Sequence, residues 1–229
     1  MIRATGLALA AMLTLGCGTA PTGSAPPPPW KVVTVPNQPP ARFVWQPDGS
    51  VRVTTDSAVG FLLRPTPEAA QGARLEWRWL VERTPPPSAP DAVGQDDRPI
   101  AVHVIFATAA PDDRALGGLR RWLRGALTHE AFAGRTLTYM WGGTLPAGTR
   151  LPNPYLPGDG HIIVLRDGST RSGTWLPESI DPVADYTSLF GGTARPTHLA
   201  LSADTEDRGG CAVALIQPPT YTGTGKAKP

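Results

Sequence analysis

The stretch "RLEWRWLVE", residues 74–82, alternates bulky apolar side chains with charged ones at a period of two. The apolar residues that would share one face of an extended chain are Leu75, Trp77, Trp79 and Val81. The charged residues that would share the opposite face are Glu76, Arg78 and Glu82. Because successive side chains of a β-strand point to opposite faces, this pattern predicts a strand between a core and solvent.

Short segments of similar character recur on both sides of this strand. Residues 99–107, "PIAVHVIFA", are apolar on both faces, which predicts a central strand. The turn "QPDG" at 46–49 indicates a hairpin. The remaining predicted strands are 41–45, 50–55, 58–64, 136–141, 161–166, 197–203 and 211–217. Many short strands joined by turns predict a mainly-β, antiparallel β-sandwich of jelly-roll type, with a single domain at 41–222.

One segment departs from the strand pattern. Residues 112–132 carry leucines at helical spacing, Leu116, Leu119, Leu123 and Leu127, and arginines that crowd the opposite side, Arg114, Arg120, Arg121 and Arg124. This predicts one inserted amphipathic helix. Either its basic face is simply solvated, or the arginines meet anionic material such as lipid head groups or acidic glycan. Residues 182–192 form a second, weakly helical stretch that ends in a glycine pair.

The N-terminal residues resemble a bacterial lipoprotein signal. Arg3 precedes an uncharged apolar run, and a small residue precedes Cys17. We therefore expect a signal peptide at 1–16 and a lipid on Cys17; the alternative is an ordinary signal peptide with a coincidental cysteine. The proline-rich residues 17–40 are expected to be an extended tether, and 223–229 a disordered tail. Gly18 after the cysteine favours a periplasm-facing outer-membrane lipoprotein of the cell envelope.

Charge and cysteine content exclude some classes of partner. The formal net charge is +2, and falls to +1 if Arg3 is removed with a signal peptide, so nucleic acid is not an expected partner. The chain has two cysteines. If Cys17 carries a lipid thioether, Cys211 cannot form an intramolecular disulfide, and we expect it to be a small buried residue on a strand.

Familiar catalytic templates are missing from the sequence. It contains neither a G-x-S-x-G elbow nor a phosphate-binding glycine loop. Its histidines, which fall on separate predicted elements without metal-ligand spacing, are His103, His129, His161 and His198. His103 lies in the most apolar strand, and we expect it to be a hydrogen-bonded core residue rather than a ligand.

An acidic group follows the predicted strand at 197–203. Asp204, Glu206 and Asp207 lie close together, but Arg208 occupies the position where an EF-hand calcium loop needs an oxygen ligand. Three interpretations remain open. The group is a solvated hairpin turn; or Asp204 and Glu206 form a looser Ca²⁺ or polar-ligand site with Asp96, Asp97 or Asp185; or the acids include a catalytic carboxylate pair.

An ordered set of short motifs resembles the bacterial family called domain of unknown function 3047. Its members share a sequence of aromatic and acidic motifs, which here read Trp77-Arg78-Trp79, Asp96-Asp97, Tyr139-Met140-Trp141, Trp175 with Glu178, Asp181, Asp185-Tyr186, Phe190-Gly191 and "SADTED" at 202–207. The resemblance spans about 41–222 and implies a sandwich like that of carbohydrate-binding modules. The family has no established activity.

This sequence also departs from the family pattern. Members usually carry an arginine where it has Ala101, and one or two more where it has Ser179 and Ile180. Without these cations, we expect the negative charges of Asp96, Asp97, Asp185 and Asp204 to be less compensated, so that a metal ion, a shared proton or solvent has to neutralise them.

These observations support three functional hypotheses. The first is an envelope-anchored lipoprotein whose non-catalytic β-sandwich binds a glycan or a protein partner; the tryptophans that could stack on sugar rings are Trp30, Trp45, Trp122 and Trp175. The second is an envelope hydrolase that acts on glycan through the acidic cluster, with or without Ca²⁺. The third is a purely structural lipoprotein. No catalytic residue is assigned.

Overall fold

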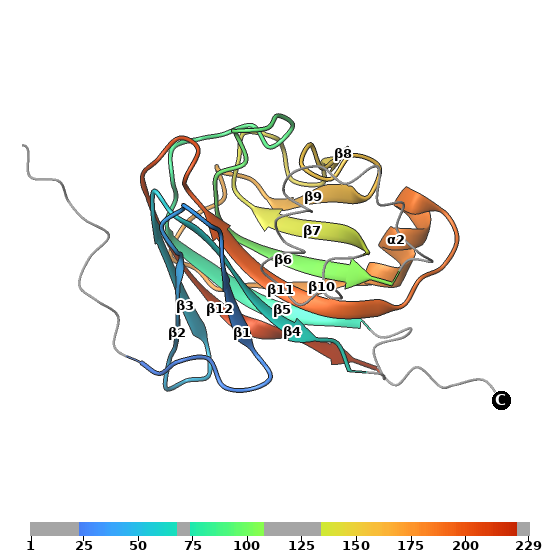
Figure 1. The fold of residues 1–229 in the computed structure, drawn as a ribbon, viewed down its shortest axis with the longest axis horizontal. Coiled ribbons are helices and arrows are strands. Elements are labelled where there is room, and N and C mark those ends of the chain that lie inside the picture. Colours follow the sequence, from blue (N-terminus) through green and yellow to red (C-terminus); the bar gives the residue numbers. More distant parts are fainter. Residues whose placement is uncertain (1–22, 68–73, 108–133, 224–229) are drawn as a thin grey trace, which may run out of the picture.

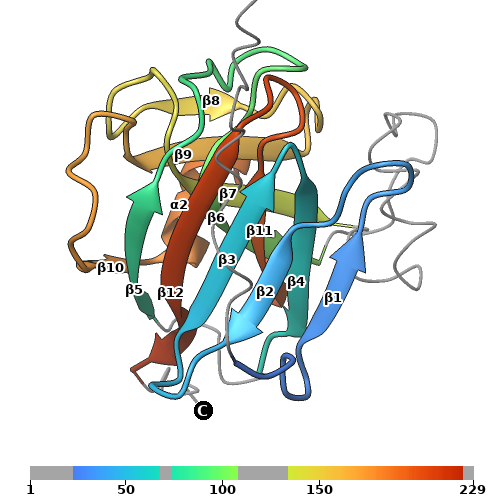
Figure 2. The ribbon, with the colours of Figure 1, turned by 90° about the vertical axis from the view of Figure 1, so that its left-hand side faces the viewer.

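The chain folds into two sheets that pack face to face, as the sequence predicts (Figure 1). The computed structural model describes residues 23–67, 74–107 and 134–223. Within them, one sheet has seven strands in the order β1 (Lys31–Thr34), β4 (Val59–Pro65), β11 (Pro196–Asp204), β6 (Arg98–Phe106), β7 (Arg135–Trp141), β9 (Gly160–Arg166) and β8 (Arg150–Pro152). The other sheet has five, in the order β10 (Leu176–Ile180), β5 (Arg74–Arg83), β12 (Cys211–Thr222), β3 (Val51–Asp56) and β2 (Arg42–Trp45) (Figure 2).

Neighbouring strands in both sheets are antiparallel, apart from the parallel pair β7 and β9. Strand β6 lies in the middle of the larger sheet between β11 and β7, and all its residues are buried. This explains why its sequence is apolar on both faces. Strand β5 instead buries alternate residues, because its second face meets solvent.

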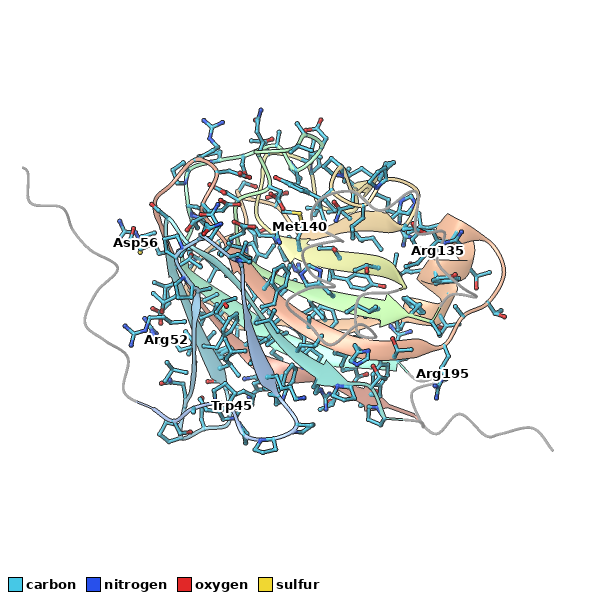
Figure 3. The ribbon with its side chains drawn as sticks, viewed as in Figure 1. Trp45, Arg52, Asp56, Arg135, Met140 and Arg195 are labelled. Carbon is cyan, nitrogen blue, oxygen red and sulfur yellow. The ribbon has the colours of Figure 1, made fainter. Side chains whose placement is uncertain are left out.

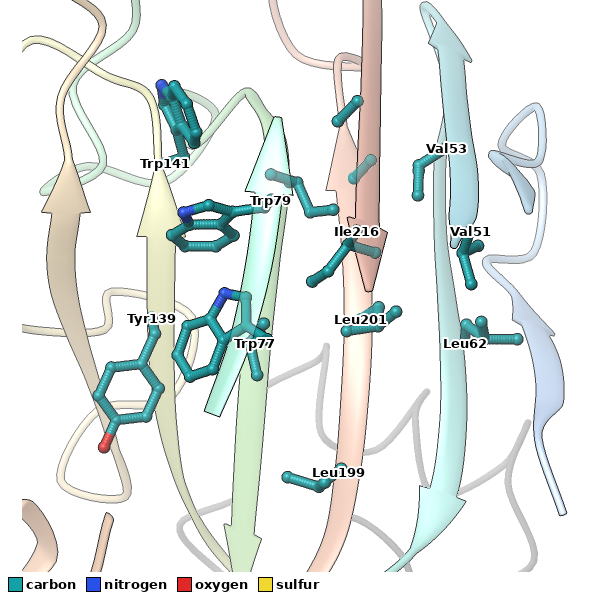
Figure 4. Packing of buried hydrophobic residues seen from close by; sticks show 14 of the residues in the cluster. Val51, Val53, Leu62, Trp77, Trp79, Tyr139, Trp141, Leu199, Leu201 and Ile216 are labelled. Carbon is teal, nitrogen blue, oxygen red and sulfur yellow. The ribbon is translucent and has the colours of Figure 1, made fainter. Parts of the chain in front are cut away.

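Large aromatic side chains fill one side of the space between the sheets (Figure 4). Trp79 is fully buried, and its ring lies 5.3 Å from that of Trp77 and 5.8 Å from that of Trp141, in edge-to-face arrangements. Smaller residues such as Val51, Val53 and Leu62 pack on the other side (Figure 4). Edge-to-face aromatic pairs contribute beyond the area that they bury, so this cluster anchors the two sheets together.

The folded domain begins earlier than predicted, because part of the expected tether belongs to the larger sheet. Strand β1 pairs with β4 at the sheet edge, and Trp30 before it is only 9% exposed. Ser24 also pairs with Trp45. The proline content of 17–40 obscured these pairings. A proline beside a short edge strand costs little, because one side of such a strand makes no ladder hydrogen bonds.

Helix α2 (Pro182–Phe190) confirms the second weakly helical stretch. The Asp181 side chain accepts hydrogen bonds from the backbone N–H groups of Val183 and Ala184, which begins the helix, and Gly191 ends it at a φ of 74°. The amphipathic helix predicted at 112–132 lies outside the described residues. None of the helices that the structure describes is long and apolar enough to cross a membrane.

Cys211 lies at the start of β12, opposite Asp56, and is buried and disulfide-bonded. The prediction that it is buried on a strand is confirmed, whereas the prediction that it forms no disulfide is wrong. The other cysteine of the chain, Cys17, lies outside the described residues.

Candidate functional site

Four of the five predicted acidic site residues meet at one end of the sandwich. Asp96 and Asp97 directly precede β6, while Asp204 ends β11 and Glu206 follows it. Strands β6 and β11 are antiparallel neighbours, with Asp204 opposite Arg98. The start of one strand therefore lies beside the end of the other, and their loops bring these acids together with Asp207. We call this group, Asp96, Asp97, Asp204, Glu206 and Asp207, the acidic end.

Arg98 compensates the charge at the acidic end and was not among the predicted site residues. Its Nη1 atom lies 2.5 Å from Oδ2 of Asp96 and 3.8 Å from Oδ2 of Asp204. Its Nη2 atom donates a hydrogen bond to the Ser202 hydroxyl, and the residue is 6% exposed. The expectation of uncompensated acids is thus wrong for Asp96 and Asp204. Arg98, three residues before Ala101, supplies a cation to these two carboxylates.

Burial and mutual repulsion change the acidity of this group. Burial raises the pKa of Asp204 well above its ordinary value; Arg98 opposes this, and Asp96 and Glu206 add to it. The pKa of Glu206 is raised by burial and by Asp207, Asp96 and Asp97. The pKa of Asp207 is raised mainly by burial and by Asp96. Such clustered perturbations are more frequent at functional sites than elsewhere, although ion-pair networks also produce them.

Asp97 has a structural task within the acidic end. It is 1% exposed, and its two carboxylate oxygens accept hydrogen bonds from the backbone N–H groups of Asp207 (3.1 Å) and Arg208 (3.0 Å). These bonds satisfy the backbone of the turn after β11 and hold Glu206 and Asp207 in place. Asp97 therefore shapes the site rather than facing a ligand.

A small cavity of about 60 Å³ opens at the acidic end. Its polar wall is formed by Asp96, Arg98, Tyr155, Asp204 and Glu206, and its apolar wall by Val35, Val59 and Phe61. The Gln38 side chain donates a hydrogen bond to Glu206. The Nε atom of Arg98 is buried and has no hydrogen-bond partner among the residues that the structure describes. A buried donor without a partner is costly, which makes this end of the sandwich a candidate binding site.

Asp185 does not join the acidic end. It lies on α2, at the right of Figure 1, whereas the β11–β12 connection lies at the upper left. Its carboxylate pairs with Arg150 at 2.7 Å and accepts a hydrogen bond from the Tyr139 hydroxyl at 3.0 Å. The predicted grouping of Asp185 with Asp204 is therefore wrong. The spacing along the chain gave no information on which end of the sandwich α2 would cover.

The described residues contain no group of three or more histidine, cysteine, aspartate or glutamate side chains arranged to hold a metal ion. Two features of the acidic end oppose Ca²⁺ coordination. Arg98 occupies the space between Asp96 and Asp204, and both oxygens of Asp97 already accept backbone hydrogen bonds. Calcium prefers six to eight oxygen ligands, so this arrangement does not favour the expected cation site.

A buried polar row extends from Arg98 into the larger sheet. Ser202 lies 2.7 Å from Nε2 of His103, and Nδ1 of His103 lies 3.0 Å from the Thr138 hydroxyl. Burial and the nearby Arg98 lower the pKa of His103 to about 3, so the ring is neutral at ordinary pH. This confirms that His103 is a hydrogen-bonded core residue. Through Ser202, the same row of hydrogen bonds also fixes the position of the Arg98 guanidinium.

Most of the candidate sugar-stacking tryptophans are not free surface residues. Trp30 is buried, and Trp45 is half-buried with its ring 6.1 Å from that of Trp30. Trp175 is half-buried beneath the guanidinium of Arg78, and Trp122 lies outside the described residues. The aromatic content of the sequence thus serves the core more than the surface.

These features define a two-sheet β-sandwich protein with a small acidic cavity at one end. The chain belongs to the family described as protein of unknown function (DUF3047), whose model matches residues 28–218. No curated protein matches the sequence.

Two solved structures are similar to this chain at low sequence identity. One is the xyloglucanase domain of NopAA, a type three effector from Sinorhizobium fredii, in complex with cellobiose, with 9% identity, a TM-score of 0.46, and coverage of 84% of this chain and 92% of that one. The other is a family 12 xyloglucanase from Bacillus licheniformis in complex with ligand, with 9% identity, a TM-score of 0.42, and coverage of 79% and 84%.

Proposed function

We propose that this chain is a non-catalytic, envelope-anchored domain that binds a glycan through the cavity at the acidic end. The observation that carries the proposal is that Arg98, whose buried Nε–H has no hydrogen-bond partner among the described residues, lines a cavity that is otherwise rich in carboxylate acceptors. A ligand group that completes this site has to accept one hydrogen bond from Arg98 and donate others to Asp96, Asp204 or Glu206.

A hydroxyl group meets both requirements, because it is a donor and an acceptor at once. An ammonium group offers no acceptor for Arg98, and an anion would be repelled by the surrounding carboxylates. Adjacent hydroxyls of a sugar therefore suit the polar wall, while Val35, Val59 and Phe61 suit the apolar C–H groups between them. The volume of about 60 Å³ suits a few small groups at the end of a sugar, not a whole ring.

Binding fits this geometry better than hydrolysis. A glycosidase places two carboxyl groups on either side of the bond that it cleaves. Here Asp96 and Asp204 both lie against the same nitrogen of Arg98, and the cavity leaves no room for two joined sugars between them.

The proposal predicts that Asp204→Asn weakens glycan binding by about tenfold, the effect of losing about 1.4 kcal/mol from one polar contact. An array of bacterial envelope glycans identifies the ligand, and isothermal titration calorimetry then compares the wild-type protein with the variant. Glu82→Gln, which alters an exposed ion pair with Arg52, is the matched control and should leave affinity unchanged. Failure of every glycan to bind contradicts the proposal, and release of new reducing ends would establish the hydrolase hypothesis instead.

Envelope anchoring rests on the signal-like residues 1–16 and on Cys17. A cysteine that carries a lipid thioether cannot also form a disulfide, so the anchor and an intramolecular disulfide at Cys211 exclude each other; in a lipidated chain the Cys211 disulfide has to be formed with a second chain. We expect wild-type protein in the membrane fraction of bacterial cells and Cys17→Ser in the soluble fraction. Mass spectrometry of the N-terminal peptide should find acyl chains, whereas a Cys17–Cys211 disulfide peptide would refute the anchor.

A further inference from the structure

The outward face of the five-stranded sheet carries a groove of about 690 Å³, far from the acidic cavity in the other sheet. This volume lies within the range of about 300–1,000 Å³ that is usual for small-molecule sites. The floor of the groove consists of two rows of side chains that run across β10, β5 and β12. In the first row Arg78 of β5 lies between Pro177 and Gln217, and in the second Glu76 of β5 lies between Ser179 and Thr220. All these side chains point away from the core.

Arg78 is the central donor of the groove. It is exposed, and its guanidinium lies 5.3 Å from the centre of the Trp175 ring. Within the described ranges it forms no ion pair and donates no hydrogen bond. Stacking on an aromatic ring restricts the motion of a guanidinium and leaves its N–H groups available. The donor is therefore held in place before any ligand arrives.

Rigid segments form the walls of the groove. On one side β12 has a bulge between Gln217 and Thr220, which places Pro218 at the groove, and the carbonyl of Pro219 accepts a 2.6 Å hydrogen bond from Arg64. Bulges commonly re-aim side chains beside binding sites. Close by, the β2–β3 turn is closed by Asp48, which accepts hydrogen bonds from the N–H and hydroxyl of Ser50.

We propose that this groove is a second binding site, for a neutral oligosaccharide chain that lies across β10, β5 and β12. The floor offers a cation, a carboxylate, an amide and hydroxyls side by side, a mixture that suits a ligand rich in hydroxyls and without net charge. Pro177 and Pro218 add apolar surface for the C–H faces of sugar rings, while the Trp175 ring holds Arg78 in position.

An extended peptide fits the groove less well than a glycan. Peptides that join a sheet use the unpaired main-chain groups of an edge strand. The groove lies on the face of the sheet, where the main chain of β5 is already paired with β10 and β12, so recognition there depends on side chains.

The test uses two unbranched neutral probes, cellohexaose and chitohexaose, titrated calorimetrically into the full protein. We expect at least one to bind, and Arg78→Ala and Trp175→Ala each to weaken that binding by tenfold or more. Arg52→Ala is the matched control, because Arg52 also projects from the outward face of this sheet but outside the groove (Figure 3). Thermal unfolding confirms that each variant is folded.

The outcomes separate this site from the acidic cavity. Loss of hexasaccharide binding in Arg78→Ala, with retention in Asp204→Asn and Arg52→Ala, supports the groove. The proposal is overturned if neither probe binds, if Arg78→Ala and Trp175→Ala bind as the wild type does, or if only Asp204→Asn loses binding. Displacement of a bound probe by a random peptide pool would likewise overturn it, by showing that the groove prefers peptide. None of these results decides whether the acidic cavity binds its own ligand.

Discussion

Replacing Arg98 by methionine is expected to lower the free energy of unfolding by about 3–5 kcal/mol at pH 7, the usual cost of removing one partner from a buried ion pair. The change leaves Asp96 and Asp204 facing each other without a cation, and it removes the hydrogen bond to Ser202. Urea unfolding followed by circular dichroism measures the loss. The matched control is Arg208→Met in the neighbouring turn, where the arginine is exposed and the expected change is within about 0.5 kcal/mol.

The destabilisation in Arg98→Met should shrink as the pH falls. Asp204, Glu206 and Asp207 all have folded-state pKa values above their ordinary ones. For a carboxyl group with a raised pKa the folded state binds the proton more tightly, so its contribution to stability is full at low pH and is lost as the pH rises through the folded-state pKa. Without Arg98 this loss becomes larger, because protonation is then the only way to remove the repulsion. A penalty that stays constant between pH 4 and pH 8 would contradict this account.

Trp79→Ala is expected to destabilise the fold by about 3–5 kcal/mol, as is usual for deletion of a buried aromatic side chain. Trp79 is fully buried between Trp77 and Trp141, and its indole N–H donates a 2.9 Å hydrogen bond to Glu178. The truncation leaves a cavity between the sheets and removes one of the donors to a mostly buried carboxylate. Guanidinium unfolding monitored by circular dichroism measures the change.

Two further variants test the cause of this effect. Trp79→Phe keeps most of the ring volume but loses the hydrogen bond, so it should cost clearly less than the alanine variant if packing dominates. Trp175→Ala removes a half-buried tryptophan on the outward face and should change stability by much less than Trp79→Ala. If Trp79→Ala were no more destabilising than Trp175→Ala, the aromatic cluster would not be what holds the sheets together.

The strands with strong alternation or continuous apolar character were predictable from the sequence, whereas the weak ones were not. Strands β5 and β6 lie within about one residue of their predicted bounds. Strands β1, β8 and β10 were missed, and they are short segments at the edges of the two sheets. An edge strand is stabilised by the neighbour that it joins, so its own sequence needs little strand character.

The acidic end was predictable only in part. The sequence singled out Asp96, Asp97, Asp204 and Glu206, which do meet, but it also included Asp185 and omitted Arg98. The sequence shows that acidic residues precede the strand that becomes β6 and follow the strand that becomes β11. It does not show that these two strands are neighbours in the sheet. That pairing places Arg98 between Asp96 and Asp204. Similarly, the rows that form the groove around Arg78 depend on the register of three strands that are distant along the chain.

By itself, the sequence determined that this protein is a mainly-β sandwich and that it belongs with the DUF3047 family, because the shared aromatic motifs are largely the residues that fill the core. These residues are buried at every second position of a strand, and such an alternation is visible in the sequence of a single segment. Only the tertiary structure decided which charges are compensated and where ligand-sized spaces open. Those features arise between strands far apart in sequence, and their energies depend on distance and burial rather than on residue order.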